Sequence, residues 1–217
     1  MVRYSIIFTV MLSITDMSAL AAQEVNPLLV RLQNKMADVQ QREKAAYSGR
    51  ERALLCSYCH GEDGNSLKPE VPNLAGQNPG YLLEQIGRFA RGERKDYVMN
   101  SLASKFSEDD QINLAIYYSS KKVKASKVDR RQAMQGKKIY RQTCQACHGQ
   151  TGKGNTGYAR LAGQKPAYIE LTLSRFRGNA QGPNALKKRR SPIMEPIASH
   201  LSDQDIRQLA AYLAGLR

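Results

Sequence analysis

The chain has 217 residues, of which 41% are hydrophobic and 24% charged, a composition typical of a globular protein rather than a disordered or collagen-like one. No apolar run approaches the roughly 18 to 20 residues that span a bilayer, which excludes a polytopic membrane protein. The 33 basic residues outnumber the 19 acidic ones and give a net charge of +14. This excess points to nucleic acid, an anionic membrane or an acidic protein as the partner.

The first residues have the organisation of a secretory signal. A basic start at residues 1–3 is followed by a mostly apolar run at 6–14 and by the small-x-small sequence Ala19-Leu20-Ala21. These features predict that residues 1–22 are a cleaved signal peptide and that the mature chain is exported. The alternative is an uncleaved membrane anchor, but the apolar run is too short and Asp16 closes it.

Residues 23–45 form an extension that we expect to be helical. Leu28, Leu32, Met36 and Val39 recur at the spacing of one helical face. We expect this face to pack on the body of the protein rather than on a membrane.

Two pairs of cysteines are each followed directly by a histidine, in the segments Cys56-Ser-Tyr-Cys59-His60 and Cys144-Gln-Ala-Cys147-His148. Cys-x-x-Cys-His is the attachment signature of c-type haem. On a helix, residues i, i+3 and i+4 share a face, so both thiols can reach the vinyl groups of one porphyrin while the histidine is aimed at the iron. Disulfides, a redox dithiol and a zinc site are alternatives. The export signal and the separation of the pairs favour two covalently bound haem c groups.

The sequence repeats itself beyond these motifs. Residues 73–82 match 160–169 at an offset of 87, and Met99 and Ala103 match Met194 and Ala198 at an offset of 95. The change of offset places an insertion in the loop before Met194. The repeat predicts two similar domains with one haem each, at residues 46–121 and 129–217, joined by a linker at 122–128.

The helical pattern of each repeat predicts an all-α fold with three or four helices around the haem. Residues 49–55 and 135–143 lead into the haem motifs, and residues 79–91 and 166–177 form the middle helices. Ser107 and Ser202 are expected to cap the last helices, since each has an aspartate three residues further on. We find no pattern of paired strands.

The number of histidines restricts which residues can provide the second axial ligand of each haem iron. His60 and His148 account for two of the three histidines, and the position matching His200 in the first repeat is a lysine. Bis-histidine ligation of both haems within one chain is therefore excluded. Methionine is the usual alternative, and Met99 and Met194 stand at matched positions after the two motifs. The other interpretation is that these methionines fill the core. Two closed irons would suit electron transfer and disfavour substrate chemistry.

The two haem motifs, the Leu-Ala-Gly-Gln segments and the Met-x-x-x-Ala runs, the second of which leads into residues 201–205, give a chain that resembles the dihaem cytochrome c4 family from about residue 46 to its end. The resemblance implies two cytochrome c folds that face each other and electron delivery in the bacterial periplasm, commonly to a terminal oxidase. It also implies thioether bonds at the four cysteines and axial ligation by His60 with Met99 and by His148 with Met194.

The sequence departs from the family pattern at two places. Pro192 stands two residues before Met194, but Tyr97 occupies that place before Met99. The second place is the residue whose carbonyl group is expected to accept the second N–H of the motif histidine. This residue is Pro72 in the first repeat but Ala159 in the second. These differences between the repeats predict that the two reduction potentials differ.

Charge is divided unevenly between the repeats. Residues 46–121 hold nine basic and ten acidic residues, whereas residues 122–217 hold nineteen basic and five acidic ones. This asymmetry predicts steering of an acidic redox partner. The basic run at residues 187–190 is either part of the docking surface or a solvated loop. Arg88 and Arg175, which match in the repeat, could pair with haem propionates.

The sequence as a whole predicts a soluble or peripherally membrane-associated electron carrier rather than an enzyme. It would pass single electrons from a quinol-oxidising complex or dehydrogenase to a terminal oxidase or reductase, and we expect no nucleic acid as partner. One alternative is a dihaem enzyme, a peroxidase or sulfur-compound dehydrogenase, with one labile haem ligand. Another is a fixed subunit of a larger complex.

Overall fold

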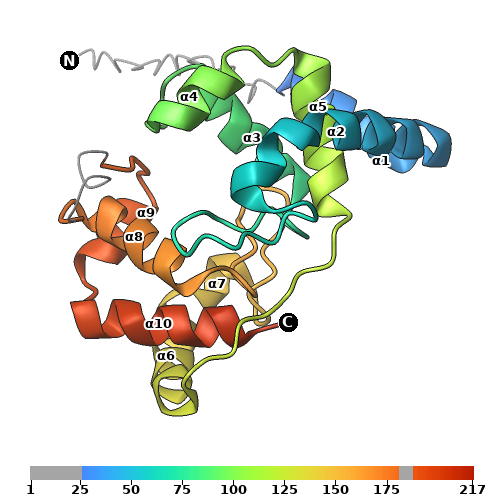
Figure 1. Ribbon diagram of the computed structural model, residues 1–217. Coiled ribbons are helices and arrows are strands. Elements are labelled where there is room, and N and C mark those ends of the chain that lie inside the picture. The colour runs from blue at the N-terminus through green and yellow to red at the C-terminus, as the bar shows by residue number, and fades with distance from the viewer. Residues whose placement is uncertain (1–25, 181–187) are drawn as a thin grey trace, which may run out of the picture.

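The computed structural model describes residues 26–180 and 188–217, and these residues form helices and loops without strands. The helices of the first half are α1 (Pro27–Ala37), α2 (Val39–His60), α3 (Pro79–Ala90), α4 (Tyr97–Ala103) and α5 (Glu108–Ser119). Those of the second half are α6 (Arg130–Thr143), α7 (Gln145–His148), α8 (Pro166–Arg177), α9 (Met194–Ser199) and α10 (Asp203–Gly215). Figure 1 shows the halves as two groups of helices, blue to green and yellow to red, joined by an extended segment after α5. The expectation of an all-α fold is confirmed for the described residues.

Neither half contains a membrane-spanning helix among its described residues: none is both long and apolar enough to cross a bilayer. The expected signal peptide at residues 1–22 lies outside the described ranges.

In each half, the helix that leads into the haem motif closely crosses the last helix: α2 crosses α5, and α6 crosses α10. A Cβ atom on Gly49 of α2 would overlap the Asn113 carbonyl oxygen of α5, and one on Gly136 of α6 would overlap the Gln208 carbonyl oxygen of α10. Glycine is therefore required at both positions because the backbones themselves are in contact. These crossings hold the start of each haem motif against the core of its own half.

The two halves differ at the entry to the haem motif. Helix α2 runs without a break through His60, whereas α6 ends at Thr143 and the short α7 carries the second motif. Cys56 follows Gly49 by seven positions, but Cys144 follows Gly136 by eight. One extra residue would rotate the motif by about 100° around a continuous helix. The interruption at Cys144 accommodates that residue.

The last helix of each half begins with a matched cap. The Ser107 and Ser202 hydroxyl groups accept hydrogen bonds from the backbone of Asp110 and Asp205, whose carboxylates accept in turn from the serine N–H groups. The N-caps expected from the sequence are confirmed. These caps satisfy backbone donors that a helix start leaves unpaired.

Helix α1 packs on the first half and has no counterpart among the described residues of the second. Leu32 is 1% exposed, and the partly buried Leu28 and Met36 pack against the same apolar core. The prediction that this face packs on the body holds for these three residues. It is wrong for Val39, which begins α2 and is 55% exposed, because the chain changes direction at Asp38.

The linker lies between the two Leu-Ala-Gly-Gln turns. Gly76 and Gly163 have positive φ values of 60° and 74°, and a Cβ atom on either glycine would crowd the Val123 side chain. Gly76 N–H donates to the Tyr118 carbonyl at 2.9 Å, and Gly163 N–H donates to the Leu213 carbonyl at 2.9 Å. One linker side chain thus packs against the equivalent turn of both halves.

Candidate haem sites

The four cysteines of the two motifs form no disulfide with one another. Burial raises the pKa of Cys56, and it raises the pKa of Cys144 to about 11. A reactive dithiol needs a thiol whose pKa is lowered toward neutral. The raised pKa values of Cys56 and Cys144 therefore disfavour the redox-dithiol interpretation.

The motif histidines have closely matched surroundings. His60 Nδ1 lies 2.9 Å from the Pro72 carbonyl oxygen, and His148 Nδ1 lies 2.9 Å from the Ala159 carbonyl oxygen. Because a carbonyl can only accept, Nδ1 must be the donor in both rings, which leaves Nε2 as a ligand atom. Burial lowers the pKa of both histidines, so that the neutral form required for metal binding is favoured.

The structure argues against a zinc site. Within residues 26–180 and 188–217, no group of three or more His, Cys, Asp or Glu side chains is placed to hold a metal ion. A structural zinc site requires four such ligands in one cluster. The donor set of each motif instead fits a haem, with two thiols for the porphyrin and one imidazole nitrogen for the iron.

Met99 and Met194 lie at the start of short helices that follow the middle helix of each half. Asp96 caps α4 by accepting a hydrogen bond from Met99 N–H at 3.2 Å, and Ser191 Oγ accepts one from Met194 N–H at 3.1 Å. Both methionine side chains are half-buried. Tyr97, the departure noted in the sequence, has an exposed side chain.

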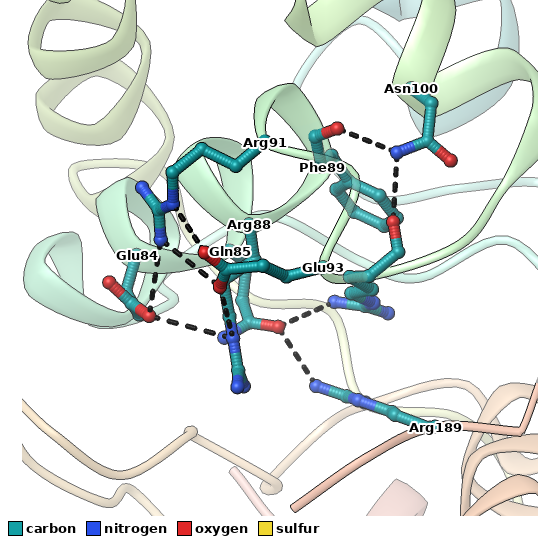
Figure 2. Close-up of polar contacts among 9 residues, drawn as sticks. Glu84, Gln85, Arg88, Phe89, Arg91, Glu93, Asn100 and Arg189 are labelled. Atoms are coloured by element: carbon teal, nitrogen blue, oxygen red, sulfur yellow. Dashed lines mark hydrogen bonds and ion pairs between the residues drawn. The ribbon is translucent and has the colours of Figure 1, made fainter.

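The two arginines predicted to pair with haem propionates have different surroundings. Arg88 Nε lies 3.6 Å from a Glu84 carboxylate oxygen and 3.5 Å from one of Glu93, as Figure 2 shows. Arg175 is half-buried, and burial lowers its pKa. The two carboxylates beside Arg88 would compete with its pairing to a propionate.

A polar cluster between the two halves was missed in the sequence. Arg94 Nη2 donates to the Tyr168 hydroxyl at 2.9 Å, and Arg189 Nη2 donates to the Tyr81 hydroxyl at 2.8 Å. Both guanidinium groups also donate to Gln85 Oε1, at 2.9 and 3.0 Å. Figure 2 shows Arg189 reaching Gln85 from the other half.

The tyrosines and arginines of this Arg–Tyr cluster occupy matched positions of the sequence repeat. The tyrosines match at an offset of 87 and the arginines at 95, the offset of the two methionines. Burial alone raises the pKa of Tyr168, but Arg94 and Arg189 lower it to about 7. This lowered pKa means that two guanidinium groups favour a negative charge at one point between the halves, so the cluster is suited to bind an anion.

Arg189 also corrects the interpretation of the basic run before Met194. Its guanidinium is partly buried at the interface, where it donates to Tyr81 and Gln85, so it is engaged within the molecule rather than free in an external docking surface. Lys188 and Arg190 are exposed and pair with Glu195, at 3.2 and 3.3 Å. Lys187 lies outside the described residues.

Known proteins match either the second half alone or most of the chain. Residues 133–217 match the family model described as cytochrome c. The chain is 35% identical over 193 residues to cytochrome c4 of Azotobacter vinelandii, covering 79% of this chain and 89% of that one. It is 33% identical over 181 residues to cytochrome c4 of Pseudomonas aeruginosa, covering 79% and 88%. Reduced recombinant cytochrome c4 from Pseudomonas stutzeri superposes with a TM-score of 0.70 at 34% identity, covering 79% of this chain and 98% of that one.

Two helical domains, each with a haem-attachment motif and a neutral, oriented histidine, define a dihaem c-type cytochrome of electron transfer. Haem c is bound covalently at the two Cys-x-x-Cys-His motifs. Within this class, the identity to its relatives and their coverage show that the chain belongs to the cytochrome c4 family.

Proposed function

We propose that the protein is a periplasmic electron carrier whose haem irons are ligated by His60 with Met99 and by His148 with Met194. The observation that carries this proposal is the matched pair of buried imidazoles, each with Nδ1 held by a backbone carbonyl and Nε2 left for iron. The haem groups supply the one-electron chemistry.

The chain's own residues fix the ligand set. The Pro72 and Ala159 carbonyl groups hold each histidine in one tautomer and orientation, which is the usual contribution of residues around a metal ligand. The Asp96 cap on α4 and the Ser191 hydroxyl before α9 fix the backbone of Met99 and Met194. With both faces occupied by protein ligands, neither iron would bind substrate.

The Arg–Tyr cluster is our preferred site for haem propionates. Arg94 and Arg189 are directed to hydroxyl and amide groups between the halves, whereas Arg88 faces two carboxylates. Arg175 remains a second candidate. Carboxylates placed in this cluster would receive charge-assisted hydrogen bonds.

For partners, we propose a quinol-oxidising complex or dehydrogenase as donor and a terminal oxidase or reductase as acceptor. The net charge of +14 on residues 122–217, against −1 on residues 46–121, supports an acidic docking surface on at least one partner. Association with the membrane would then be peripheral.

Turnover measurements separate this carrier from the dihaem enzyme. We expect the purified protein to take up two electrons per chain reversibly and to show no turnover with hydrogen peroxide or thiosulfate. The uptake can be followed in the haem absorption bands. Sustained consumption of either substrate would reject the carrier and support the enzyme.

A further inference from the structure

Two buried glutamines connect the halves through the backbone. Gln164 is 7% exposed; its Oε1 accepts from Asn73 N–H at 2.7 Å, and its Nε2 donates to the Asn73 carbonyl at 3.0 Å. Gln77 is 6% exposed and makes the same two bonds to Arg160, at 2.6 and 2.9 Å. Each glutamine is the last residue of a Leu-Ala-Gly-Gln turn and reaches into the opposite half.

In the first half, the residue that Gln164 holds belongs to the peptide unit beside the haem histidine. The carbonyl of the 72–73 peptide accepts the His60 Nδ1–H bond at 2.9 Å. The N–H of that same peptide donates to Gln164. A single peptide unit therefore connects the histidine of the first half to a glutamine of the second.

The second half repeats this arrangement. The carbonyl of the 159–160 peptide accepts from His148 Nδ1–H at 2.9 Å, and the N–H of that peptide donates to Gln77. The loops that carry both peptides lie between the two groups of helices in Figure 1. We call this connection, from a glutamine through a peptide unit to the histidine of the opposite half, a relay. One relay runs in each direction across the interface.

The peptide group transmits the effect of one hydrogen bond to the other. Its resonance moves electron density from nitrogen to oxygen, and a hydrogen bond at the N–H increases the negative charge on the carbonyl oxygen. Hydrogen bonds linked in this way strengthen one another by about 10–30%. A stronger acceptor at Nδ1 makes the imidazole a better electron donor to a metal at Nε2. Such a ligand stabilises the oxidised iron and lowers its reduction potential.

We infer that Gln77 and Gln164 are positioning residues, each of which lowers the reduction potential of the haem bound in the opposite half. Gln164 acts on the haem held by His60, and Gln77 acts on the haem held by His148. This inference rests on the proposed ligation by these two histidines.

Another interfacial side chain provides a matched control. Asn78 Nδ2 donates across the interface to the Lys153 carbonyl at 3.0 Å and to the Tyr158 carbonyl at 2.8 Å. Neither oxygen belongs to the 159–160 peptide. Asn78→Ala therefore removes two bonds between the halves without interrupting a relay.

The test compares Gln164→Leu, Gln77→Leu and Asn78→Ala in the holoprotein. Midpoint potentials are measured by spectroelectrochemical titration. The Nδ1–H signals of His60 and His148 are followed by NMR of the reduced, ¹⁵N-histidine-labelled protein, which assigns each effect to one histidine.

We expect Gln164→Leu to raise one midpoint potential and to move the His60 Nδ1–H signal upfield, with the His148 signal unchanged. Gln77→Leu should raise the other potential and move only the His148 signal. Asn78→Ala should move neither signal. The inference is overturned if Gln164→Leu moves the His148 signal or Gln77→Leu moves the His60 signal instead. It is also overturned if Asn78→Ala produces the same shifts, or if the midpoint potentials do not change.

Glutamate variants provide a second measurement if the leucine variants do not fold. Gln164→Glu keeps an oxygen against the Asn73 N–H, and its negative charge makes that oxygen a stronger acceptor. We expect the His60 Nδ1–H signal to move downfield, opposite to the leucine variant. A shift in the same direction as in the leucine variant, or no shift, would overturn the inference.

The low-spin absorption of the wild-type protein separates the proposed ligation from this inference. Its absence would reject the proposed ligation, whereas its presence without the cross-domain effects would reject this inference alone.

Discussion

At the scale of single residues, the helix crossings depend on the absence of a side chain. A methyl group on Gly136 would meet the Gln208 backbone rather than a movable side chain. Gly136→Ala should therefore lower the free energy of unfolding by about 1–3 kcal/mol, the usual cost of overpacking. Urea unfolding followed by circular dichroism measures this change. Gly157→Ala is the control, since a Cβ there has only the Asn155 side chain at 4.0 Å; equal effects of both substitutions would contradict the account.

At the scale of secondary-structure elements, α1 is held mainly by burial of its apolar face. Leu32 is almost fully buried, whereas the ion pairs of Arg31 and Lys35 with α5 are exposed and contribute little. Leu32→Ala should lower the free energy of unfolding by about 2–5 kcal/mol. Chemical unfolding compares it with Val30→Ala on the same helix, a position that is 37% exposed. A Leu32→Ala protein as stable as the Val30→Ala protein would show that α1 does not pack as described.

At the scale of the whole molecule, the uneven charge should govern encounters with small redox reagents. The net charge of +14 is concentrated in residues 122–217. Oxidation by the anion hexacyanoferrate(III) should slow on the order of 10-fold as salt is raised from low to high ionic strength, because screening weakens the attraction. Stopped-flow rates with the cation hexaammineruthenium(III) provide the control and should increase over the same range. An anion rate that is independent of salt would contradict this account.

The sequence predicted those parts of the molecule that depend on local patterns. The haem motifs, the caps at Ser107 and Ser202 and the all-α fold follow from spacing along one helix or one turn. Val39 was misassigned because a helical repeat does not reveal where the chain changes direction. Ligation by Met99 and Met194 remains a prediction.

The contacts between the halves could not be predicted in the same way. Arg94 and Arg189 match in the repeat, but their role depends on how the two copies face each other. Arg189 also stands in a run of four basic residues, a pattern typical of solvated surface, and yet it is half-buried and hydrogen-bonded between the halves. The bonds of Gln77 and Gln164 to the opposite half are likewise a property of the assembled pair of domains.

Carbon monoxide binding to the fully reduced holoprotein tests whether each haem iron has two protein ligands. Carbon monoxide occupies an iron only where the sixth position is open or its ligand is readily displaced. With His60 and Met99 on one iron and His148 and Met194 on the other, the absorption spectrum of both haems should remain unchanged after the gas is added. A carbon monoxide adduct at either haem would show an accessible iron and would contradict the assignment of this protein as a simple electron carrier.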